Sequence, residues 1–349
     1  MKTLPATSSL DADRAAYYGR IEVEHLAPLW TRLKSLVPAG PQTVGQPHRW
    51  RYADVRPHVF ESGQLISAAE AERRVLILEN PAFRGKSRIT NSLYAGLQLL
   101  LPGEVAPAHR HTQSALRLVL EGGGAYTAVD GEKTIMREGD FVITPSWTWH
   151  HHGNDSDAPI VWLDGLDIPT VAFFNSTFRE DHRDGAEAEI IRPIGDALAR
   201  YGSGLLPIGH RAENLNSPVF SYPYARTREA LGAMARAGSP DPRHGYLMRF
   251  ANPVDGGWAM PTIATMIRLL PAGFSTLRYR SSDACVFVAL EGTGAITIEG
   301  TRLSFGPRDV ITVPGWLAYT LEAASDAVLF SFSDRVVQEK LGFFRESNG

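Results

Sequence analysis

An internal repeat is the feature of this chain that most limits what it can fold into. Residues 120–127 read Leu-Glu-Gly-Gly-Gly-Ala-Tyr-Thr, and residues 290–297 read Leu-Glu-Gly-Thr-Gly-Ala-Ile-Thr. Two copies so far apart in 349 residues predict two similar domains, because a repeated sequence pattern builds a repeated structural unit. Other pairs support the duplication: Asn80-Pro81 with Asn252-Pro253, Asp140 with Asp309, and 144–147 with 313–316.

Both copies have the texture of an all-β domain. From Arg73 onward, short β-rich runs alternate with Gly, Pro and Asp, as in a sandwich or barrel. The predicted strands of the first copy lie at 75–78, 96–101, 116–120, 125–129, 141–144 and 160–163. Before them, apolar residues recur at helical spacing from Ala12 to Leu36, which predicts one or two helices.

These patterns divide the chain into four parts. We expect an N-terminal helical arm and lead-in over 1–72 and a first β domain over 73–192. A linker rich in Pro, Gly and charge follows over 193–243, with a short helix near 227–237. The second β domain occupies 244–349. The predicted fold class is therefore all-β dominated, with two barrels and an N-terminal helical segment.

Composition excludes several classes of partner. Hydrophobic residues make up 44% and charged residues 21%, which is typical of a folded protein. A formal net charge of −3 without a run of Lys or Arg predicts no nucleic-acid or membrane binding, so we expect a small-molecule partner. No stretch resembles a signal peptide or a membrane span, and the single Cys285 fits a reducing compartment, so a cytoplasmic location is expected.

A cluster of spaced histidines marks the first copy. Gly103 is followed after five residues by His109-Arg110-His111, and Gly139 after five residues by Pro145 and then His150 and Asn154. Alternate side chains of a strand share one face, so His109 and His111 are predicted to point together into the domain. A lone histidine in a β protein is more often structural, but three histidines tied to Gly, Pro and Asn markers indicate a metal site.

These two signatures resemble the two motifs of the cupin superfamily, whose domains are small double-stranded β-helix, or jelly-roll, barrels. The resemblance implies a bicupin with a metal held by His109, His111 and His150. The chain departs from the superfamily at two positions, since Ala115 stands in the slot of a ligand Glu and Trp147 in the slot of a Gly. A site of three histidines without a carboxylate leaves coordination positions for a bidentate substrate and dioxygen together.

Polar residues near the histidines extend the candidate site. If the strand continues from His111, Gln113, Ala115 and Arg117 could follow on the same inward face. A buried guanidinium needs an anionic partner. That partner is either a substrate carboxylate or a buried Asp or Glu. His152 shares its side of a strand with His150 and could hydrogen-bond a substrate oxygen or move a proton.

The stretches 94–98, 107–115, 144–150 and 162–169 make the likeness narrower, because they resemble gentisate 1,2-dioxygenases and their salicylate-cleaving relatives. That family implies Fe(II), an extradiol-type non-haem iron dioxygenase and a homotetramer. It also implies an aromatic acid with a hydroxyl next to its carboxylate, and ring cleavage by O2 between the two carbons that bear them. The implied substrate-binding residues are Arg117, Gln98, Tyr94 and Arg73, and the implied catalytic residues are His152 and Asp164.

Several alternatives stay open from the sequence. Gentisate, which would give maleylpyruvate, competes with a substituted salicylate, 1-hydroxy-2-naphthoate and a non-catalytic binding role. Cupin isomerases and decarboxylases mostly use a Glu ligand, which Ala115 argues against. Gln98 and Tyr94 could be ordinary core residues, Asp164 could cap a turn at Gly165, and the effect of His151 on substrate choice is open. In the second copy the ligand positions read Tyr279, Ser281 and Tyr319, which predicts a metal-free barrel.

Overall fold

The computed structural model describes residues 7–183, 187–212 and 214–347 and divides into two units, Met1–Gln42 and Thr43–Gly349. The first unit contains α1 (Thr7–Val23) and α2 (Leu29–Leu36), so the prediction of one or two helices over this segment is confirmed. Pro28 stands at the N-cap of α2 and brings extended backbone to the start of that helix.

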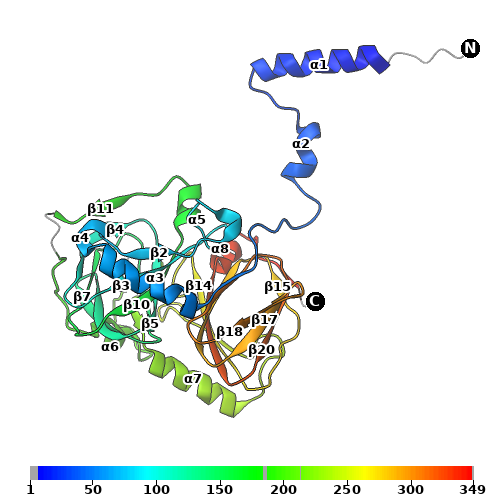
Figure 1. Ribbon diagram of the computed structural model, residues 1–349. Coiled ribbons are helices and arrows are strands. Elements are labelled where there is room, and N and C mark those ends of the chain that lie inside the picture. The colour runs from blue at the N-terminus through cyan, green and yellow to red at the C-terminus, as the bar shows by residue number, and fades with distance from the viewer. Residues whose placement is uncertain (1–6, 184–186, 213, 348–349) are drawn as a thin grey trace, which may run out of the picture. The chain divides into compact units, whose positions relative to one another are not determined.

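The second unit consists of two β barrels (Figure 1). The first barrel combines a six-stranded sheet, β12-β8-β5-β10-β3-β2, with a five-stranded sheet, β11-β4-β9-β6-β7. The second combines β1-β19-β16-β21-β14-β13 with β18-β17-β20 and the short ribbon β15-β22. The strands of the first barrel are β2 (Val75–Ile77), β3 (Tyr94–Leu100), β4 (Val105–His111), β5 (Ala115–Glu121), β6 (Gly123–Val129), β7 (Glu132–Arg137), β8 (Phe141–Thr144), β9 (His150–Gly153), β10 (Ile160–Leu166), β11 (Arg179–Asp181) and β12 (Ser221–Tyr222).

The second barrel repeats this pattern, and the predicted fold class of two barrels is confirmed. Its strands are β1 (His48–Trp50), β13 (Tyr246–Arg249), β14 (Ala264–Leu270), β15 (Arg280–Ser281), β16 (Cys285–Glu291), β17 (Gly294–Ile298), β18 (Thr301–Phe305), β19 (Val310–Val313), β20 (Tyr319–Ala323), β21 (Ala327–Ser333) and β22 (Glu346–Ser347). The helices of this unit are α3 (Tyr52–Leu65), α4 (Ala68–Ala71), the 3-10 helix η1 (Pro81–Phe83), α5 (Ile168–Phe173), α6 (Asp196–Tyr201), α7 (Tyr224–Ala237) and α8 (Arg335–Lys340).

Each six-stranded sheet is covered on both faces, which explains its nearly continuous apolar strands. In β5, Leu116, Leu118 and Leu120 belong to the core between the two barrels. The alternate residues Arg117 and Val119 belong to the interior of the first barrel, and both are buried. The period of two in a strand therefore separates packing residues from site residues along the same segment.

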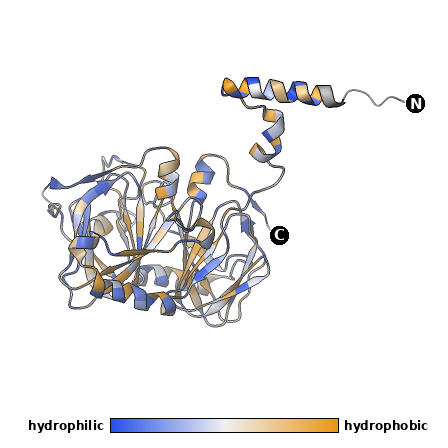
Figure 2. Cartoon of the chain, turned by 45° about the horizontal axis from the view of Figure 1, so that its top comes forward, coloured by the Kyte–Doolittle hydropathy of each residue, from blue (hydrophilic) through white to orange (hydrophobic). Residues whose placement is uncertain are grey.

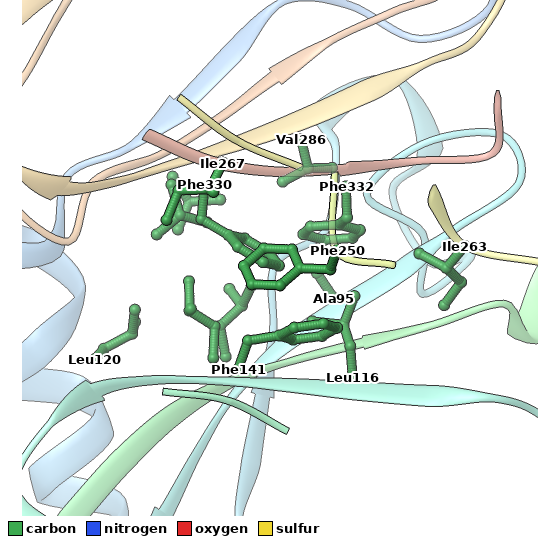
Figure 3. Close-up of a cluster of buried hydrophobic side chains, with 14 of the residues drawn as sticks. Ala95, Leu116, Leu120, Phe141, Phe250, Ile263, Ile267, Val286, Phe330 and Phe332 are labelled. Atoms are coloured by element: carbon green, nitrogen blue, oxygen red, sulfur yellow. The ribbon is translucent and has the colours of Figure 1, made fainter. Parts of the chain in front are cut away.

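The core between the barrels joins them into one packed body. Phe141 of the first barrel packs against Phe250 and Phe330 of the second, with ring centroids 4.6 and 5.4 Å apart. Figure 3 shows these rings between the two sheets, with Ile267 and Val286 beside them. Hydrophobic residues, orange in Figure 2, accordingly run along the strands of both barrels.

The two barrels also exchange strands. β1 precedes the first barrel in sequence but pairs with β19 of the second, with Trp50 opposite Val310. β12 precedes the second barrel but pairs with β8 of the first, with Tyr222 opposite Phe141. The structural repeat thus begins at β1 and again at β12, ahead of the β domains predicted to begin at residues 73 and 244. That predicted division, with its linker over 193–243, stays a prediction.

Matching helices follow the exchanged strands and bind the repeated Leu-Glu-Gly motif. Tyr52 of α3 donates its hydroxyl hydrogen to Glu121 at 2.8 Å, and Arg56 donates from Nε to the same oxygen at 2.7 Å. Tyr224 of α7 donates to Glu291 at 2.6 Å, and Arg228 joins it at 3.0 Å. Both helices carry Tyr-Ala-x-x-Arg, a further repeat in the sequence that was not among the predicted ones.

Candidate metal centre and substrate cavity

Three histidines converge inside the first barrel. His109 and His111 come from β4, and His150 of β9 lies opposite His109 in the antiparallel pairing of these strands. One ring nitrogen from each lies within 4.8 Å of the other two, so the group could hold a metal ion. It is the one group of three or more His, Cys, Asp or Glu side chains with such geometry in the described part of the chain. The sequence prediction that these three residues come together is therefore met by the geometry.

The turn before His150 explains why β9 lies beside β4. Trp147 has φ of +60°, a left-handed conformation that favours glycine, and its N–H donates to the His111 carbonyl at 2.7 Å. Its ring packs against Phe178 at 4.6 Å between centroids. The glycine-type turn expected of a cupin is thus kept although a tryptophan occupies the position. Trp316 in the second copy has φ of +67° and makes the same contact with Ser281.

Backbone carbonyls orient two of the three imidazole rings. His111 Nδ1 lies 2.9 Å from the Gln113 carbonyl, and His150 Nδ1 lies 2.9 Å from the Thr148 carbonyl. A carbonyl accepts only, so each Nδ1 carries the hydrogen and each Nε2 keeps its lone pair. His150 Nε2 is buried without a hydrogen-bond partner among the described residues. Such an orphaned lone pair, oriented by a carbonyl behind the ring, is the usual arrangement of a metal-binding histidine.

The protonation of the cluster also suits a metal. Burial lowers the pKa of His109 to about 2 and that of His111 to about 4. Burial also lowers the pKa of His150 well below its usual value, with His109 and His111 acting in the same direction. All three imidazoles are therefore neutral at pH 7, the form that binds metal ions.

The third imidazole ring, that of His109, is contacted by Arg73. Its Nη2 donates to the Pro107 carbonyl at 2.9 Å and also contacts His109 Nδ1. A guanidinium can only donate, so His109 Nδ1 is an acceptor here and the ring hydrogen lies on Nε2. Binding a metal through Nε2 would move that hydrogen to Nδ1, and Arg73 would then have to turn away. Burial lowers the pKa of Arg73 to about 10, which leaves it a cation at pH 7.

A cavity of about 370 Å³ opens beside the histidines. This volume is within the range of small-molecule sites. Its lining combines the three histidines with polar and apolar side chains from both sheets and from the segments beside them: Arg73, Val75, Tyr94, Gln98, Gln113, Arg117, Asp164, Leu166, Ile168, Thr177, Phe178 and Arg179. A larger cavity of about 510 Å³ lies near Trp147 and His210, but it contains none of the predicted site residues.

Arg117 is held in the barrel interior by three neighbours. Its Nη1 donates to the Thr144 hydroxyl, its Nη2 lies 3.1 Å from His152 Nε2, and its Nε lies 3.5 Å from Asp164 Oδ1. The strand does not continue from His111 as the sequence suggested, because β4 ends there and Arg117 comes from β5. The structure is compatible with either predicted anionic partner of Arg117. The buried acid is Asp164, and the guanidinium also lines the cavity, where it could meet a substrate carboxylate.

Asp164 faces Arg117 because β10 pairs with β5 in a register that sets the two residues opposite each other. Trp162 donates its Nε1 hydrogen to Asp164 Oδ1 at 3.0 Å. Burial raises the pKa of Asp164 to about 6, and Arg117 and the Trp162 hydrogen bond both oppose that rise. A carboxyl group that titrates so close to neutral pH, on the wall of a cavity, is suited to exchanging protons.

His152 lies behind Arg117 and does not line the cavity. Its Nε2 accepts from Arg117, and its Nδ1 lies 3.0 Å from the Thr127 hydroxyl. Both ring nitrogens are thus occupied by protein groups. Its predicted catalytic role stays a prediction, and the geometry gives it a place in orienting Arg117.

The remaining sequence candidates differ in position. Gln98 is buried, and its Nε2 has no hydrogen-bond partner in residues 7–183, 187–212 and 214–347. Tyr94 lines the cavity at the other end of β3. His151 alternates with its neighbours on β9 and points away from the cavity, where its Nε2 lies 3.3 Å from Glu187. Ala115 is buried, and no carboxylate joins the three histidines within the described residues.

Part of the lining comes from segments that carry no local sequence signal. Gln113 was expected on the inward face two residues after His111, and it does line the cavity. Phe178 and Arg179 were not foreseen, because their segment reaches the cavity only through contacts with β4. Arg179 lies opposite His111 in the pairing of β11 with β4, and the Phe178 carbonyl accepts from the Thr112 N–H at 3.2 Å. Arg179 is bound at the rim to Glu72 at 2.9 Å, and Glu72 precedes Arg73 in the chain.

The second barrel places Tyr279, Ser281 and Tyr319 where the first has its three histidines. The two tyrosine rings are buried in an apolar cluster with Phe287 and Ile296. The most similar feature of the two barrels is therefore their backbone, whereas their interiors differ in chemistry. A pair of such barrels, the first with three convergent neutral histidines that could hold a metal ion, defines a bicupin.

Comparisons with known proteins agree with this class. Residues 96–166 match the cupin domain family. The chain is 54% identical over 335 residues to "Gentisate 1,2 dioxygenase 1" of Aquipseudomonas alcaligenes, covering 96% of each protein. It is 34% identical to the 5-aminosalicylate 1,2-dioxygenase of a Comamonas species, covering 98% of this chain and 92% of that protein.

A solved structure gives the same result in three dimensions. Salicylate 1,2-dioxygenase from Pseudoaminobacter salicylatoxidans, solved as adducts with gentisate, matches with a TM-score of 0.88 and 33% identity over 99% of this chain and 95% of that one. The chain belongs to the gentisate and salicylate 1,2-dioxygenase family, whose members are ring-cleaving dioxygenases. Among the described residues no helix has the length and apolarity needed to cross a membrane.

Proposed function

We propose that the chain is an Fe(II)-dependent dioxygenase that opens gentisate between its carboxyl-bearing and adjacent hydroxyl-bearing carbons, giving maleylpyruvate. The observation that carries the proposal is the cluster of His109, His111 and His150 on the wall of a substrate-sized cavity. The 54% identity to a protein named for gentisate supports the choice of substrate.

Three neutral imidazoles and no carboxylate leave the ion its full positive charge and open positions on one side. Fe(II) bound there would supply adjacent positions for the substrate oxygens and for O2, and a path for electrons between them. His111 and His150 would bind through Nε2, since their Nδ1 atoms face carbonyls. His109 would complete the set once Arg73 turns from it.

The guanidinium groups explain how a hydroxy acid would be oriented. Arg117 is fixed by Thr144 and His152 and lines the cavity, so it can donate to a substrate carboxylate without first losing side-chain freedom. Arg73, released from His109 by metal binding, would bring a second donor to the same region. Charge-assisted bonds of this kind are the strongest polar contacts that a protein offers to a carboxylate.

The other polar groups of the cavity would hydrogen-bond the substrate hydroxyl groups and transfer protons. The unpartnered Nε2 of Gln98 can donate to a ring hydroxyl oxygen, and Tyr94 closes the same wall. Asp164 is the group we assign to proton transfer, because it lines the cavity and has a pKa of about 6. His152 would keep Arg117 in place, with the Thr127 hydroxyl behind it.

Related substrates form the second candidate. Curated relatives include proteins named for 5-aminosalicylate and for 1-hydroxy-2-naphthoate, at 34% and 33% identity. The same carboxylate and ortho-hydroxyl contacts would serve all of these acids, so the side of the cavity opposite the guanidinium groups must select among them.

We further propose a homotetramer in the cytoplasm, as the family resemblance implies. Light scattering on the purified chain measures the assembly.

The test begins with anaerobic reconstitution with Fe(II) and measurement of bound iron. Oxygen uptake and ultraviolet spectra are then recorded with gentisate, salicylate, 5-aminosalicylate and 1-hydroxy-2-naphthoate. We expect uptake with the absorbance of a conjugated keto acid for gentisate, and its loss in His111→Ala. Stoichiometric iron without oxygen consumption for any of these acids would contradict the dioxygenase proposal, whereas preference for another acid would correct the substrate.

A further inference from the structure

Arg179 lies at the mouth of the substrate cavity and differs in exposure from the two guanidinium groups deeper inside. All three arginines line the cavity. The Arg179 side chain is 44% exposed, whereas that of Arg117 is 5% exposed. Arg73 is half-buried and stands between these extremes. The three cations therefore form a series that runs from the solvent to the barrel interior.

Two acids bind Arg179 outside the cavity. Its Nη2 lies 2.9 Å from Glu72 Oε2, and its Nε donates to Asp181 Oδ1 at 2.6 Å. Neither acid is part of the cavity lining, and their side chains are 57% and 65% exposed. Ion pairs between groups this exposed contribute little, because water solvates both partners well and salt screens their attraction. Arg179 can therefore exchange either acid for another anion at small cost.

A tight turn keeps Glu72 outside the cavity while the next side chain points into it. Glu72 has φ of +52° and ψ of −49°, and the Arg73 N–H donates to the Ala71 carbonyl, which makes a γ-turn. β11 and the end of α4 lie side by side at one edge of the first barrel (Figure 1). The turn thus places Glu72 against Arg179 and leaves Arg73 to the interior.

The charges on the cavity wall favour an anionic ligand. Three cations line the wall against one carboxylate, that of Asp164, which is paired with Arg117. The polar contacts of Arg73 are to the Pro107 carbonyl and to His109, and neither of these groups carries a negative charge. The acids that bind Arg179 lie outside the wall, in solvent. An anion that enters the cavity therefore passes Arg179 first and then approaches a cation without an acidic partner.

We propose that Arg179 captures the carboxylate of the incoming substrate at the cavity mouth. It exchanges its two exposed acids for the substrate carboxylate, which then moves inward to Arg73 and Arg117. The inference rests on the proposed function, because it requires an anionic aromatic acid as the substrate. A cation at the mouth of a cleft raises the rate of association more than the affinity of the final complex, and salt weakens this effect.

The rate at which gentisate binds the iron-loaded full chain without oxygen tests this role. Binding is followed by stopped-flow fluorescence, with Trp162 as a reporter because its indole donates to Asp164 on the cavity wall. kcat/KM from oxygen uptake is measured beside it. Both are recorded at low salt and at about 0.5 M salt, where charges are screened beyond roughly 4 Å.

Arg179→Gln should lower the association rate about two- to tenfold at low salt and much less at high salt, with little change in the dissociation rate. Arg179→Lys keeps the charge and should retain most of the rate. The matched control is Arg192→Gln, since Arg192 is also a partly exposed cation, paired with Asp130, and does not line this cavity. This control should stay close to wild type.

A second comparison separates capture of the substrate from masking of the two acids. In Arg179→Gln, the carboxylates of Glu72 and Asp181 lose their partner and would repel an anion by themselves. Arg179→Gln is therefore also made in a Glu72→Gln/Asp181→Asn background, where both acids are neutral amides. The background alone should bind gentisate faster than wild type, and loss of Arg179 from it should slow binding again.

The proposal for Arg179 is overturned if its loss from this background leaves the rate unchanged. It is also overturned if Arg179→Gln and Arg192→Gln behave alike, or if the neutral carboxamide of gentisate is slowed as much as gentisate. Failure of the proposed function gives a different result, because wild type itself would then neither bind nor consume any of the hydroxy acids.

Discussion

Replacing Arg117 with methionine would test the proposed recognition of the substrate carboxylate. The side chain keeps most of its apolar length, but the donors that line the cavity disappear. A hydrogen bond to a charged group contributes about 1.5–3 kcal/mol, and each 1.36 kcal/mol is a factor of ten. We therefore expect kcat/KM for gentisate to fall by roughly 10- to 150-fold. Arg117→Lys should fall less, because it keeps the charge and loses only the planar fork.

The same substitution leaves Asp164 without its cation. Losing one partner of a buried pair costs up to about 3–5 kcal/mol, and less here because the cavity admits water and Asp164 can take up a proton. A lower thermal midpoint is expected in Arg117→Met and not in Arg117→Lys.

The assay is steady-state oxygen uptake by iron-loaded protein, with gentisate and with its carboxamide. The carboxamide has no negative charge, so Arg117→Met should change its kcat/KM much less than that of gentisate. Equal loss of activity toward both compounds in a variant that binds iron normally, or no loss toward gentisate, would exclude Arg117 as the group that binds the carboxylate.

The remaining predictions concern Asp164, the core between the barrels and the metal. Trp162→Phe removes the hydrogen bond that opposes the raised pKa of Asp164, so the acid limb of kcat/KM against pH should move to higher pH; an unmoved limb would remove Asp164 from proton transfer. Because the folded pKa of Asp164, about 6, lies above its ordinary value of 3.8, the folded state binds this proton more tightly, and stability falls as pH rises from about 4 to 6. Asp164→Asn should lack that loss, about 3 kcal/mol at most, in urea unfolding at pH 4 and 7; a slope equal to wild type would contradict it. Phe330→Ala should lower the free energy of unfolding by about 3–5 kcal/mol and leave iron content unchanged when folded. Removing the metal with a chelator should lower the thermal midpoint of wild type but not of His111→Ala, by mass action on the native state.

Much of the fold could be predicted because its signals are local or repeated. The Leu-Glu-Gly repeat around Glu121 and Glu291 indicated two similar barrels, and alternating apolar residues marked their strands. The exchange of β1 and β12 between barrels was not foreseen, since strand pairing depends on contacts between residues far apart in sequence. The Tyr-Ala-x-x-Arg repeat at Tyr52 and Tyr224, in the helices that follow these two strands, is the one local sequence feature related to the exchange.

By itself, the sequence determined the histidine cluster of this protein. His109 and His111 share a face because strand side chains alternate. The spacing of Gly139, Pro145 and Asn154 around His150 predicts the turn that precedes this histidine. These are short-range constraints, so spacing alone conveys them.

Only the tertiary structure decided which of the surrounding polar groups line the cavity and which of them lie behind its wall. Arg117 meets Asp164 through the register of β5 with β10, which places Asp164 on the cavity wall and His152 behind the guanidinium. Arg179 reaches the cavity through the pairing of β11 with β4. Burial, which requires the whole barrel, then raises the pKa of Asp164 to about 6 and keeps the histidines neutral. Register and burial depend on the packing of distant segments, and no local pattern in the chain specifies either.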